Sequence, residues 1–220
     1  MRAQTILFDL DGTLSDSARG ILAALRHAFA VNGLPPMDAA TERAILGPPF
    51  HESLPGYLGG VPLADVVTAY REHYLGGAMF DTSVYAGIHP LLAALQDADV
   101  TMAVATSKPE FYATAIVDHL GLSPYFRVVG GDVPDGSGTK ADVIGRVLQR
   151  LGDPDPADVL MVGDRRHDVE GARVHGIDTV GVRWGYALPG ELEAAGAWAI
   201  CASPAELAAL IEAGRDAAAC

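Results

Sequence analysis

The part of the sequence that decides the fold reads TILFDLDGTL, at residues 5–14. Its first four residues form an unbroken apolar run, which is typical of a short strand covered on both faces of a parallel sheet. Two carboxylates, Asp9 and Asp11, follow where this strand must end, and a glycine comes next. The stretch therefore predicts a buried strand that delivers two acidic side chains to one edge of a sheet.

Four further runs along the chain have the same strand character, and they alternate with amphipathic helical patterns. We expect strands at residues 101–105, 126–129, 159–162 and 179–182, and helices at residues 110–120, 141–151 and 169–175. Gly121, Gly152 and Gly176 stand just past these helices, as left-handed C-terminal caps do. A last helix is expected after Ser203, where Ser-Pro-Ala-Glu reads as a capping box. The alternation predicts an α/β fold with a doubly wound parallel sheet.

Residues 17–81 break this alternation. Apolar residues at helical spacing, from Ile21 to Val31 and from Val66 to Tyr74, predict two amphipathic helices, and Gly47-Pro48-Pro49 separates them. No strand pattern occurs in this block. We therefore expect an α/β core domain formed by residues 1–16 and 82–220, with a helical cap domain inserted at residues 17–81.

Composition limits the cellular setting and the partners. The 220 residues are 50% hydrophobic, enough for a sizeable core, and carry a net charge of -13, which disfavours nucleic acids and anionic membranes as partners. Cys201 and Cys220 give no disulfide framework. The sequence shows no signal peptide and no membrane-spanning window. We expect a cytoplasmic protein that is a monomer or a weak dimer.

Polar residues gather where the predicted strands end. Because ligands of open parallel sheets bind at the carboxyl ends of the strands, these side chains should share one site. They are Asp9, Asp11, Thr106, Ser107, Lys140, Asp164 and Asp168. Several carboxylates at one edge repel each other unless a cation lies among them, and Mg²⁺ prefers such oxygen ligands. The hydroxyls and the lysine suit a phosphoryl group, so the pattern predicts Mg²⁺-dependent phosphoryl transfer.

Each of these residues has a simpler explanation when taken alone. An aspartate at a strand end can cap a turn, Asp168 can cap a helix, and Lys140 can be a solvated surface residue. The segment GSGTK at residues 136–140 is similar to a phosphate-binding loop but lacks its lysine spacing. The combination of residues, in this order and at strand ends, is what favours a catalytic site.

FDLDGTL at residues 8–14 resembles the first motif of the haloacid dehalogenase (HAD) superfamily. Thr106, Lys140 and the segment GDRRHD at residues 163–168 are similar to its second, third and fourth motifs, in the same order. The helical block stands where that superfamily carries a C1 cap. The segments ATSKP (105–109) and GVRWGY (181–186) further resemble the phosphoglycolate phosphatase-like branch, although Ala187 stands where that branch has a glycine.

The resemblance implies a role for each candidate residue. Asp9 would be the nucleophile that forms an aspartyl-phosphate, and Asp11 would protonate the leaving oxygen and then activate water. Mg²⁺ would be held by Asp9, the main-chain carbonyl of Asp11 and Asp164, with Asp168 as a further ligand or just behind the ligands. Thr106, Ser107 and Lys140 would hold the phosphate oxygens.

These roles imply a phosphatase for a small phosphorylated metabolite, phosphoglycolate or a nucleoside monophosphate. Two alternatives remain open at the level of sequence. One is transfer to an acceptor other than water, by a sugar-phosphate mutase or a HAD-type protein tyrosine kinase. The other is an inactive regulatory relative. We expect residues 47–50 of the cap to contact the substrate, and we expect Trp184, Gly185 and Tyr186 to pack against the core.

Overall fold

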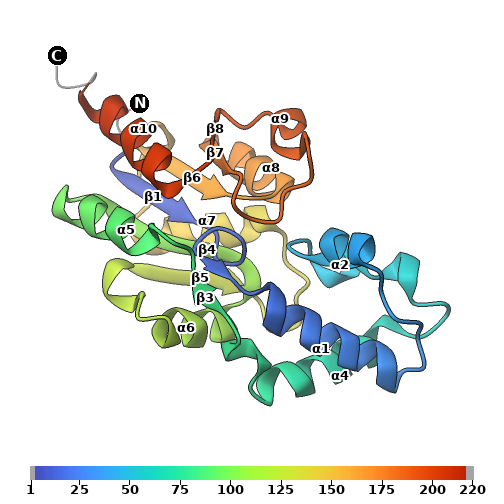
Figure 1. The fold of residues 1–220 in the computed structure, drawn as a ribbon. Helices are drawn as coiled ribbons and strands as arrows, with labels where there is room; N and C mark the ends of the chain where they lie inside the picture. The colour runs from blue at the N-terminus through green and yellow to red at the C-terminus, as the bar shows by residue number, and fades with distance from the viewer. Residues whose placement is uncertain (1–2, 217–220) are drawn as a thin grey trace.

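A computed structural model describes residues 3–216 and has a parallel sheet at its centre (Figure 1). Six strands follow the order β5-β4-β1-β6-β7-β8, and every neighbouring pair is parallel. They are β1 (Thr5–Phe8), β4 (Thr101–Pro109), β5 (Val128–Asp132), β6 (Val159–Gly163), β7 (Asp178–Val182) and β8 (Ala199–Cys201). The predicted doubly wound α/β fold is confirmed.

Helices cover both faces of this sheet, which explains why its strands are apolar without alternation. In β1, Ile6 and Phe8 belong to one hydrophobic cluster and Leu7 to another on the opposite face. Apolar residues of α7 and α8 pack in the cluster of Leu7, and those of α5, α6 and α10 in the other. These helices are α5 (Ile88–Asp97), α6 (Glu110–His119), α7 (Lys140–Leu151), α8 (Arg166–Val174) and α10 (Pro204–Asp216).

The predicted helix ends are confirmed in detail. Gly152 closes α7 in the left-handed region, and Gly121 and Gly176 follow α6 and α8 with positive φ as well. At the start of α10, the Ser203 hydroxyl oxygen accepts a hydrogen bond from the Glu206 N–H at 3.2 Å. The Glu206 carboxylate accepts from the N–H of Ala202, one residue before the position that a capping box uses. Cys220 lies outside the described residues.

Several core elements were not predicted from the sequence, one strand was misplaced, and one strand is longer than predicted. The unpredicted elements are α5, β8 and the short helix α9 (Glu191–Ala195), with the 3-10 helices η3 (Ser123–Tyr125) and η4 (Pro156–Asp158). Strand β4 continues to Pro109, and β5 begins at Val128 and includes two glycines. A Cβ on Gly130 would lie 2.2 Å from Val147 Cγ2, so this glycine allows α7 to approach the sheet closely.

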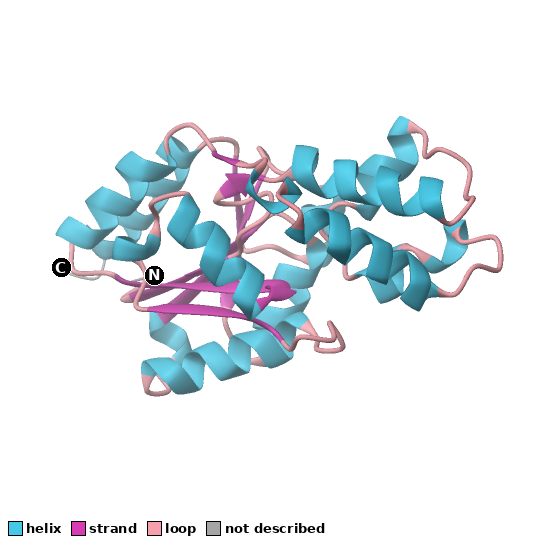
Figure 2. Cartoon of the chain, turned by 90° about the horizontal axis from the view of Figure 1, so that it is seen from below, coloured by secondary structure: helices cyan, strands magenta, loops and turns pink. Residues whose placement is uncertain are grey.

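Residues 17–81 contain helices only, as predicted. They are α1 (Ala18–Val31), α2 (Ala39–Ile45), α3 (Phe50–Ser53), η1 (Pro55–Tyr57), α4 (Leu63–Leu75) and η2 (Ala78–Phe80). Figures 1 and 2 show these helices gathered at one end of the core. Two short antiparallel strands, β2 (Ser15–Asp16) and β3 (Ser83–Val84), pair where the chain leaves the core and returns to it. Within residues 3–216, no helix has the length and hydrophobicity that crossing a membrane requires.

The close contact between α1 and η2 gives a test of the fold. A Cβ on Gly20 would lie 2.1 Å from the carbonyl oxygen of Ala78. We expect Gly20→Ala to lower the free energy of unfolding by about 1–3 kcal/mol through overpacking. Helix propensity alone predicts the opposite sign, a gain of about 1 kcal/mol.

Urea denaturation measures the difference between wild type and variant. Gly56→Ala is the control, because that glycine is exposed and has no atom within 4 Å of the added Cβ. Gly56→Ala should change the free energy of unfolding by no more than about 0.5 kcal/mol. A Gly20→Ala variant as stable as wild type would contradict the packing of α1 on η2.

Candidate active site

The site forms where the chain changes direction across the sheet. Strand β1 lies between β4 and β6, and the chain builds one side of the sheet before it crosses to the other. Such a switch point leaves a crevice at the carboxyl ends of the two central strands. Asp9 follows β1 directly and Asp164 follows β6 directly. The Asp9 N–H donates to the carbonyl oxygen of Val162 at 2.9 Å, which fixes the position of Asp9 beside β6.

The turn after β1 is shaped by the carboxylate of Asp164. Gly12 has a φ of 87°, and its N–H donates to the carbonyl oxygen of Ser15 at 2.8 Å. A Cβ on Gly12 would lie 2.2 Å from Asp164 Oδ2, and one on Gly185 would lie 2.5 Å from the same oxygen. The Asp-Gly-Thr turn thus needs glycine both for its backbone conformation and for the space that Asp164 occupies.

Three buried aspartates form an acidic cluster at this point. Asp9, Asp164 and Asp168 each place one carboxylate oxygen within 4.8 Å of the others. Asp164 accepts hydrogen bonds from the Thr13 hydroxyl at 3.3 Å and from the Tyr186 N–H at 2.7 Å. These bonds fix the orientation of the Asp164 carboxylate beside the other two aspartates.

Lys140 supplies the positive charge at the cluster. Its Nζ lies 2.6 Å from one oxygen of Asp9 and 2.6 Å from one oxygen of Asp168. Burial by itself lowers the pKa of Lys140, but the two carboxylates outweigh burial and raise this pKa above its usual value. Burial raises the pKa of Asp9 to about 6 against the opposing charge of Lys140. Burial and the charges of Asp9 and Asp168 likewise raise the pKa of Asp164.

One lysine thus faces three carboxylates, and the excess of negative charge favours binding of a cation. The donor atoms are all carboxylate oxygens, the ligands that Mg²⁺ prefers. The acidic cluster fits the predicted metal site in its charge, in its ligand type and in the closeness of its oxygens.

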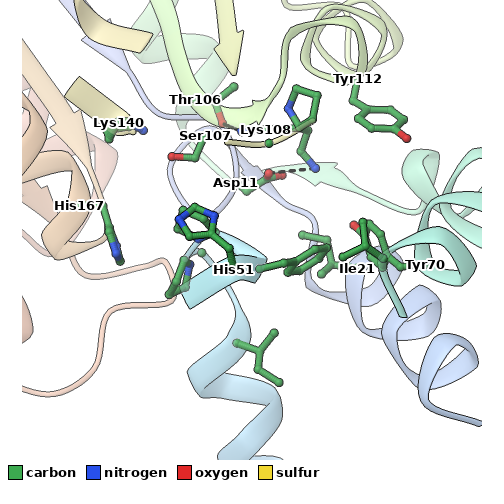
Figure 3. Close-up of a pocket in the computed structure, with 18 of the residues that line it drawn as sticks. Asp11, Ile21, His51, Tyr70, Thr106, Ser107, Lys108, Tyr112, Lys140 and His167 are labelled. Atoms are coloured by element: carbon green, nitrogen blue, oxygen red, sulfur yellow. Dashed lines mark hydrogen bonds and ion pairs between the residues drawn. The ribbon is translucent and has the colours of Figure 1, made fainter. Parts of the chain in front are cut away.

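The side chain of Asp11 stands apart from this cluster. Its Oδ2 forms an ion pair with Lys108 Nζ at 3.0 Å (Figure 3). Its Oδ1 is buried and has no hydrogen-bond partner among residues 3–216. Lys108 also donates to the Tyr74 hydroxyl of α4 at 2.7 Å. Burial by itself lowers the pKa of Lys108, but Asp11, Tyr74 and Tyr70 together outweigh burial and raise this pKa above its usual value. The sequence reasoning gave Lys108 no role, and the one available signal was its place two residues after Thr106.

The predicted phosphate-binding residues lie at the end of β4 and the start of α7. Thr106 is buried, and its hydroxyl oxygen accepts from the Lys108 N–H at 3.3 Å. Thr106 and Ser107 fall within β4 rather than after it, because this strand is four residues longer than predicted. The predicted residues that line one common cavity are Asp9, Asp11, Thr106, Ser107, Lys140 and Asp168. Asp164 lies fully buried behind them.

This cavity has a volume of about 200 Å³ and is lined by both the core and residues 17–81. The predicted contact segment, Gly47 to Phe50, lines it as expected. Figure 3 shows Ile21, His51 and Tyr70 facing the residues of the strand ends. The helical block therefore forms one wall of the site and the core forms the other.

Polar contacts hold the helical block against the core around the cavity. Arg71 of α4 donates to the carbonyl oxygens of Pro134 at 3.0 Å and Asp135 at 3.3 Å. On another side, Glu52 of α3 lies 3.3 Å from Arg166 and 3.0 Å from His167. These contacts close the cavity from several directions.

The segment from Trp184 to Tyr186 packs against the core as expected and also supports the site. The Tyr186 hydroxyl accepts from the Ser17 N–H at 2.8 Å and lies 3.0 Å from Asp16 Oδ1, at the first connection to the helical block. The main-chain N–H of Tyr186 holds Asp164, as described above. Sequence reasoning missed this link because it joins residues about 170 positions apart in the chain.

Comparisons with known proteins agree with this architecture. The chain is 47% identical to tyrosine-protein kinase PtkA of Mycobacterium tuberculosis over 184 residues, 83% of this chain and 63% of that protein. It is 34% identical to a 5'-nucleotidase of Pseudomonas aeruginosa, over 96% of this chain and 97% of that protein. A crystal structure of a predicted phosphatase from Clostridium acetobutylicum superposes with a TM-score of 0.90 at 34% identity, covering 96% of this chain and 99% of that one.

A family model described as haloacid dehalogenase-like hydrolase matches residues 6–182, from β1 to the end of β7. The matched region contains the residues of the acidic cluster, Lys140 and the whole helical block. The chain belongs to the haloacid dehalogenase-like hydrolase family.

Proposed function

We propose that the protein is a Mg²⁺-dependent phosphatase that hydrolyses a small phosphomonoester through an aspartyl-phosphate on Asp9. The observation that carries this proposal is the position of Asp9 in the cavity, paired with Lys140 and grouped with Asp164 and Asp168. A buried carboxylate next to a lysine and hydroxyl groups is suited to attack a phosphoryl group.

In the proposed reaction, a carboxylate oxygen of Asp9 attacks phosphorus while the bond from phosphorus to the leaving oxygen breaks. Asp11 gives a proton to that oxygen and then, as a carboxylate, takes a proton from the water that hydrolyses the aspartyl-phosphate. Lys140, Thr106 and Ser107 donate to the phosphoryl oxygens. Inorganic phosphate leaves and the Asp9 carboxylate is restored.

Four groups would hold Mg²⁺: the carboxylates of Asp9, Asp164 and Asp168 and the main-chain carbonyl of Asp11. The bound ion would neutralise phosphoryl charge and so let an anionic carboxylate approach an anionic ester. Lys140 balances part of the charge of the cluster at all times, because it is held by two of the three aspartates.

Residues 17–81 act in this proposal as a cap domain on a core of residues 1–16 and 82–220. The connections at β2 and β3 are the points where such a cap would hinge. Closure would exclude water and select the leaving group. The volume of the cavity, about 200 Å³, supports a small metabolite as substrate. We further propose that the protein acts in the cytoplasm, as a monomer or weak dimer; the free, buried thiol of Cys201 is consistent with a reducing compartment.

A second candidate is transfer of the phosphoryl group from Asp9 to a tyrosine hydroxyl. The relative named tyrosine-protein kinase PtkA, at 47% identity, is the observation that favours it. Both functions need the same aspartyl-phosphate and differ only in the acceptor. The contacts of Arg71 and Glu52 with the core favour water as the acceptor, because a protein substrate would have to break them to reach Asp9. An inactive relative is disfavoured because the acidic cluster and Lys140 are all present.

One experiment compares the two acceptors directly. Purified protein with Mg²⁺ is given a panel of phosphomonoesters, and phosphate release is measured. A parallel reaction contains ATP and a tyrosine-containing peptide, and phosphotyrosine is measured. We expect phosphate release that Asp9→Asn abolishes. Phosphotyrosine formation without hydrolysis of any ester would instead establish the kinase.

The acidic cluster predicts strict dependence on a small divalent cation. We expect hydrolysis to stop in excess EDTA and to return with Mg²⁺ but poorly with Ca²⁺, which is larger and favours more ligands. Asp164→Asn should weaken Mg²⁺ binding, measured by calorimetry, because it removes one charge of the cluster. Full turnover in EDTA would show that the cluster holds no essential metal.

Substitutions of Asp9 and of Asp11 should affect turnover and Mg²⁺ affinity differently. Asp9→Asn removes the nucleophile and a cluster charge, so turnover should fall to that of a control without enzyme and Mg²⁺ affinity should drop. Asp11→Asn keeps an oxygen that can accept from Lys108, so Mg²⁺ affinity should persist while turnover of an alkyl ester falls roughly 10²- to 10⁴-fold.

Single-turnover rates and calorimetry on both variants test this division of roles. The loss in Asp11→Asn should be smaller for the first step on p-nitrophenyl phosphate, whose leaving group needs less protonation. Equal loss of Mg²⁺ binding in the two variants would contradict the roles assigned here. So would wild-type turnover of the alkyl ester by Asp11→Asn.

A further inference from the structure

A continuous row of aromatic rings lines the active-site cavity. Phe50 and Tyr70 meet edge to face with ring centroids 4.7 Å apart, and Tyr70 stacks on Tyr74 at 5.1 Å. Tyr74 then meets Tyr112 of α6 edge to face at 5.7 Å. All four residues line the cavity, so rings from the helical block and from the core form one wall.

This aromatic wall stands next to the proposed acid, where the leaving group of a bound ester would be. Lys108 Nζ lies 3.0 Å from Asp11 Oδ2 and 4.8 Å from the centre of the Tyr74 ring, so the row of rings passes close to Asp11. In Figure 3, Tyr70, Tyr112 and Ile21 appear on the other side of Asp11 from Lys140. The phosphate end and the leaving-group end of the cavity therefore differ in character, the first charged and the second apolar.

Aliphatic side chains complete the apolar end. Ile21 of α1 and Val67 of α4 line the same cavity. Water in contact with such surfaces is displaced favourably by an apolar ligand, and flat ligands pack well against aromatic rings.

The lysines and arginines of this cavity, among residues 3–216, are already engaged by groups of the protein. Lys140 is held by two aspartates of the cluster and Lys108 by Asp11. Arg71 is bonded to two main-chain carbonyls and Arg165 to Glu191 at 2.8 Å. A carboxylate on the leaving group would lose its hydration beside the rings, and the lysine that lies there, Lys108, is already paired with Asp11, so such a group would be costly to bind.

We infer that the leaving group is an uncharged alcohol that carries a flat apolar ring, in preference to a small carboxylate such as glycolate. The inference rests on the proposed phosphatase function and narrows its substrate class. A benzyl or phenyl group and a nucleoside base share the chemistry that this wall recognises.

The wild-type protein with Mg²⁺ tests the inference on benzyl phosphate, propyl phosphate and phosphoglycolate. Benzyl and propyl alcohol are both primary alkoxide leaving groups, so the main difference between these two esters is the ring. We expect kcat/KM for benzyl phosphate to exceed that for propyl phosphate by about tenfold or more. Phosphoglycolate should be the poorest of the three.

Two further esters test whether the ring of the substrate belongs to a tyrosine or to a nucleoside. Phosphotyrosine carries the ring directly on the leaving oxygen, and a nucleoside 5'-monophosphate carries it on a sugar. A nucleoside 5'-monophosphate that exceeds propyl phosphate supports the inference, because both are esters of primary alcohols. Phosphotyrosine is not compared with propyl phosphate in this way, since its phenol is the better leaving group whatever the cavity recognises. Equal rates for benzyl and propyl phosphate, or phosphoglycolate as the best ester, would overturn it while the phosphatase function stands. No hydrolysis of any ester would instead overturn the proposed function, and the inference with it.

A pair of variants tests the aromatic wall itself. Phe50→Ala removes the first ring of the row, and we expect the ratio of kcat/KM for benzyl to propyl phosphate to fall several-fold. Tyr57→Ala is the matched control, because Tyr57 is an exposed aromatic residue of the same helical block and does not line the cavity. The ratio of kcat/KM for benzyl to propyl phosphate in Tyr57→Ala should equal that of wild type.

The ratio is measured on one preparation, so partial unfolding of a variant cancels. An unchanged ratio in Phe50→Ala would contradict the role of the wall even if both rates fall.

Discussion

The ion pairs of Lys140 with Asp9 and Asp168 are the contacts on which the rest of the site depends. Three carboxylates buried within a few ångströms of each other are costly unless positive charge lies among them. Lys140 reaches two of them at 2.6 Å each, from the first position of α7. Helix α7 in turn is anchored by a capping box between Thr139 and Asp142. The position at which α7 begins therefore determines where the positive charge of Lys140 lies relative to the carboxylates at the strand ends.

Glycines provide the space for this concentration of charge. Gly12 and Gly185 lack the side-chain atoms that would collide with the Asp164 carboxylate. In the same way, a Cβ on Gly163 would lie 2.2 Å from Asp168 Cγ. Hydrogen bonds from Thr13 and Tyr186 then orient Asp164. The excess of negative charge that remains is the physical reason to expect a divalent cation there.

The chemistry and the cover of the site are connected through two tyrosines. Tyr74 of the helical block shares Lys108 with Asp11, and Tyr186 joins Asp164 to the first connection of that block. A displacement of the helices would therefore change the surroundings of Asp11 directly.

The sequence alone determined those features of the protein that depend on residues close together in the chain. The apolar run before Asp9, the helix ends and the helical block at residues 17–81 are encoded by neighbouring residues, and their patterns were correct. The shared edge of the strands also followed, because a parallel sheet brings its carboxyl ends together. For this reason the residues expected at the site, from Asp9 to Asp168, are indeed found together.

Only the tertiary structure decided which of these residues touch. Asp9 and Lys140 are 131 positions apart, and no local pattern specifies a 2.6 Å contact over that separation. The same holds for the ion pair of Asp11 with Lys108 and for the hydrogen bond from Tyr186 to Asp164. The aromatic wall, too, depends on contacts between separate segments of the chain. The strand expected at residues 126–129 was misplaced as well: β5 runs from Val128 to Asp132, and its Gly130 and Gly131 leave space for Val147 of α7 and for the start of α6. Residue types and their order give the chemistry that is available, whereas side-chain packing between distant segments selects the contacts that use it.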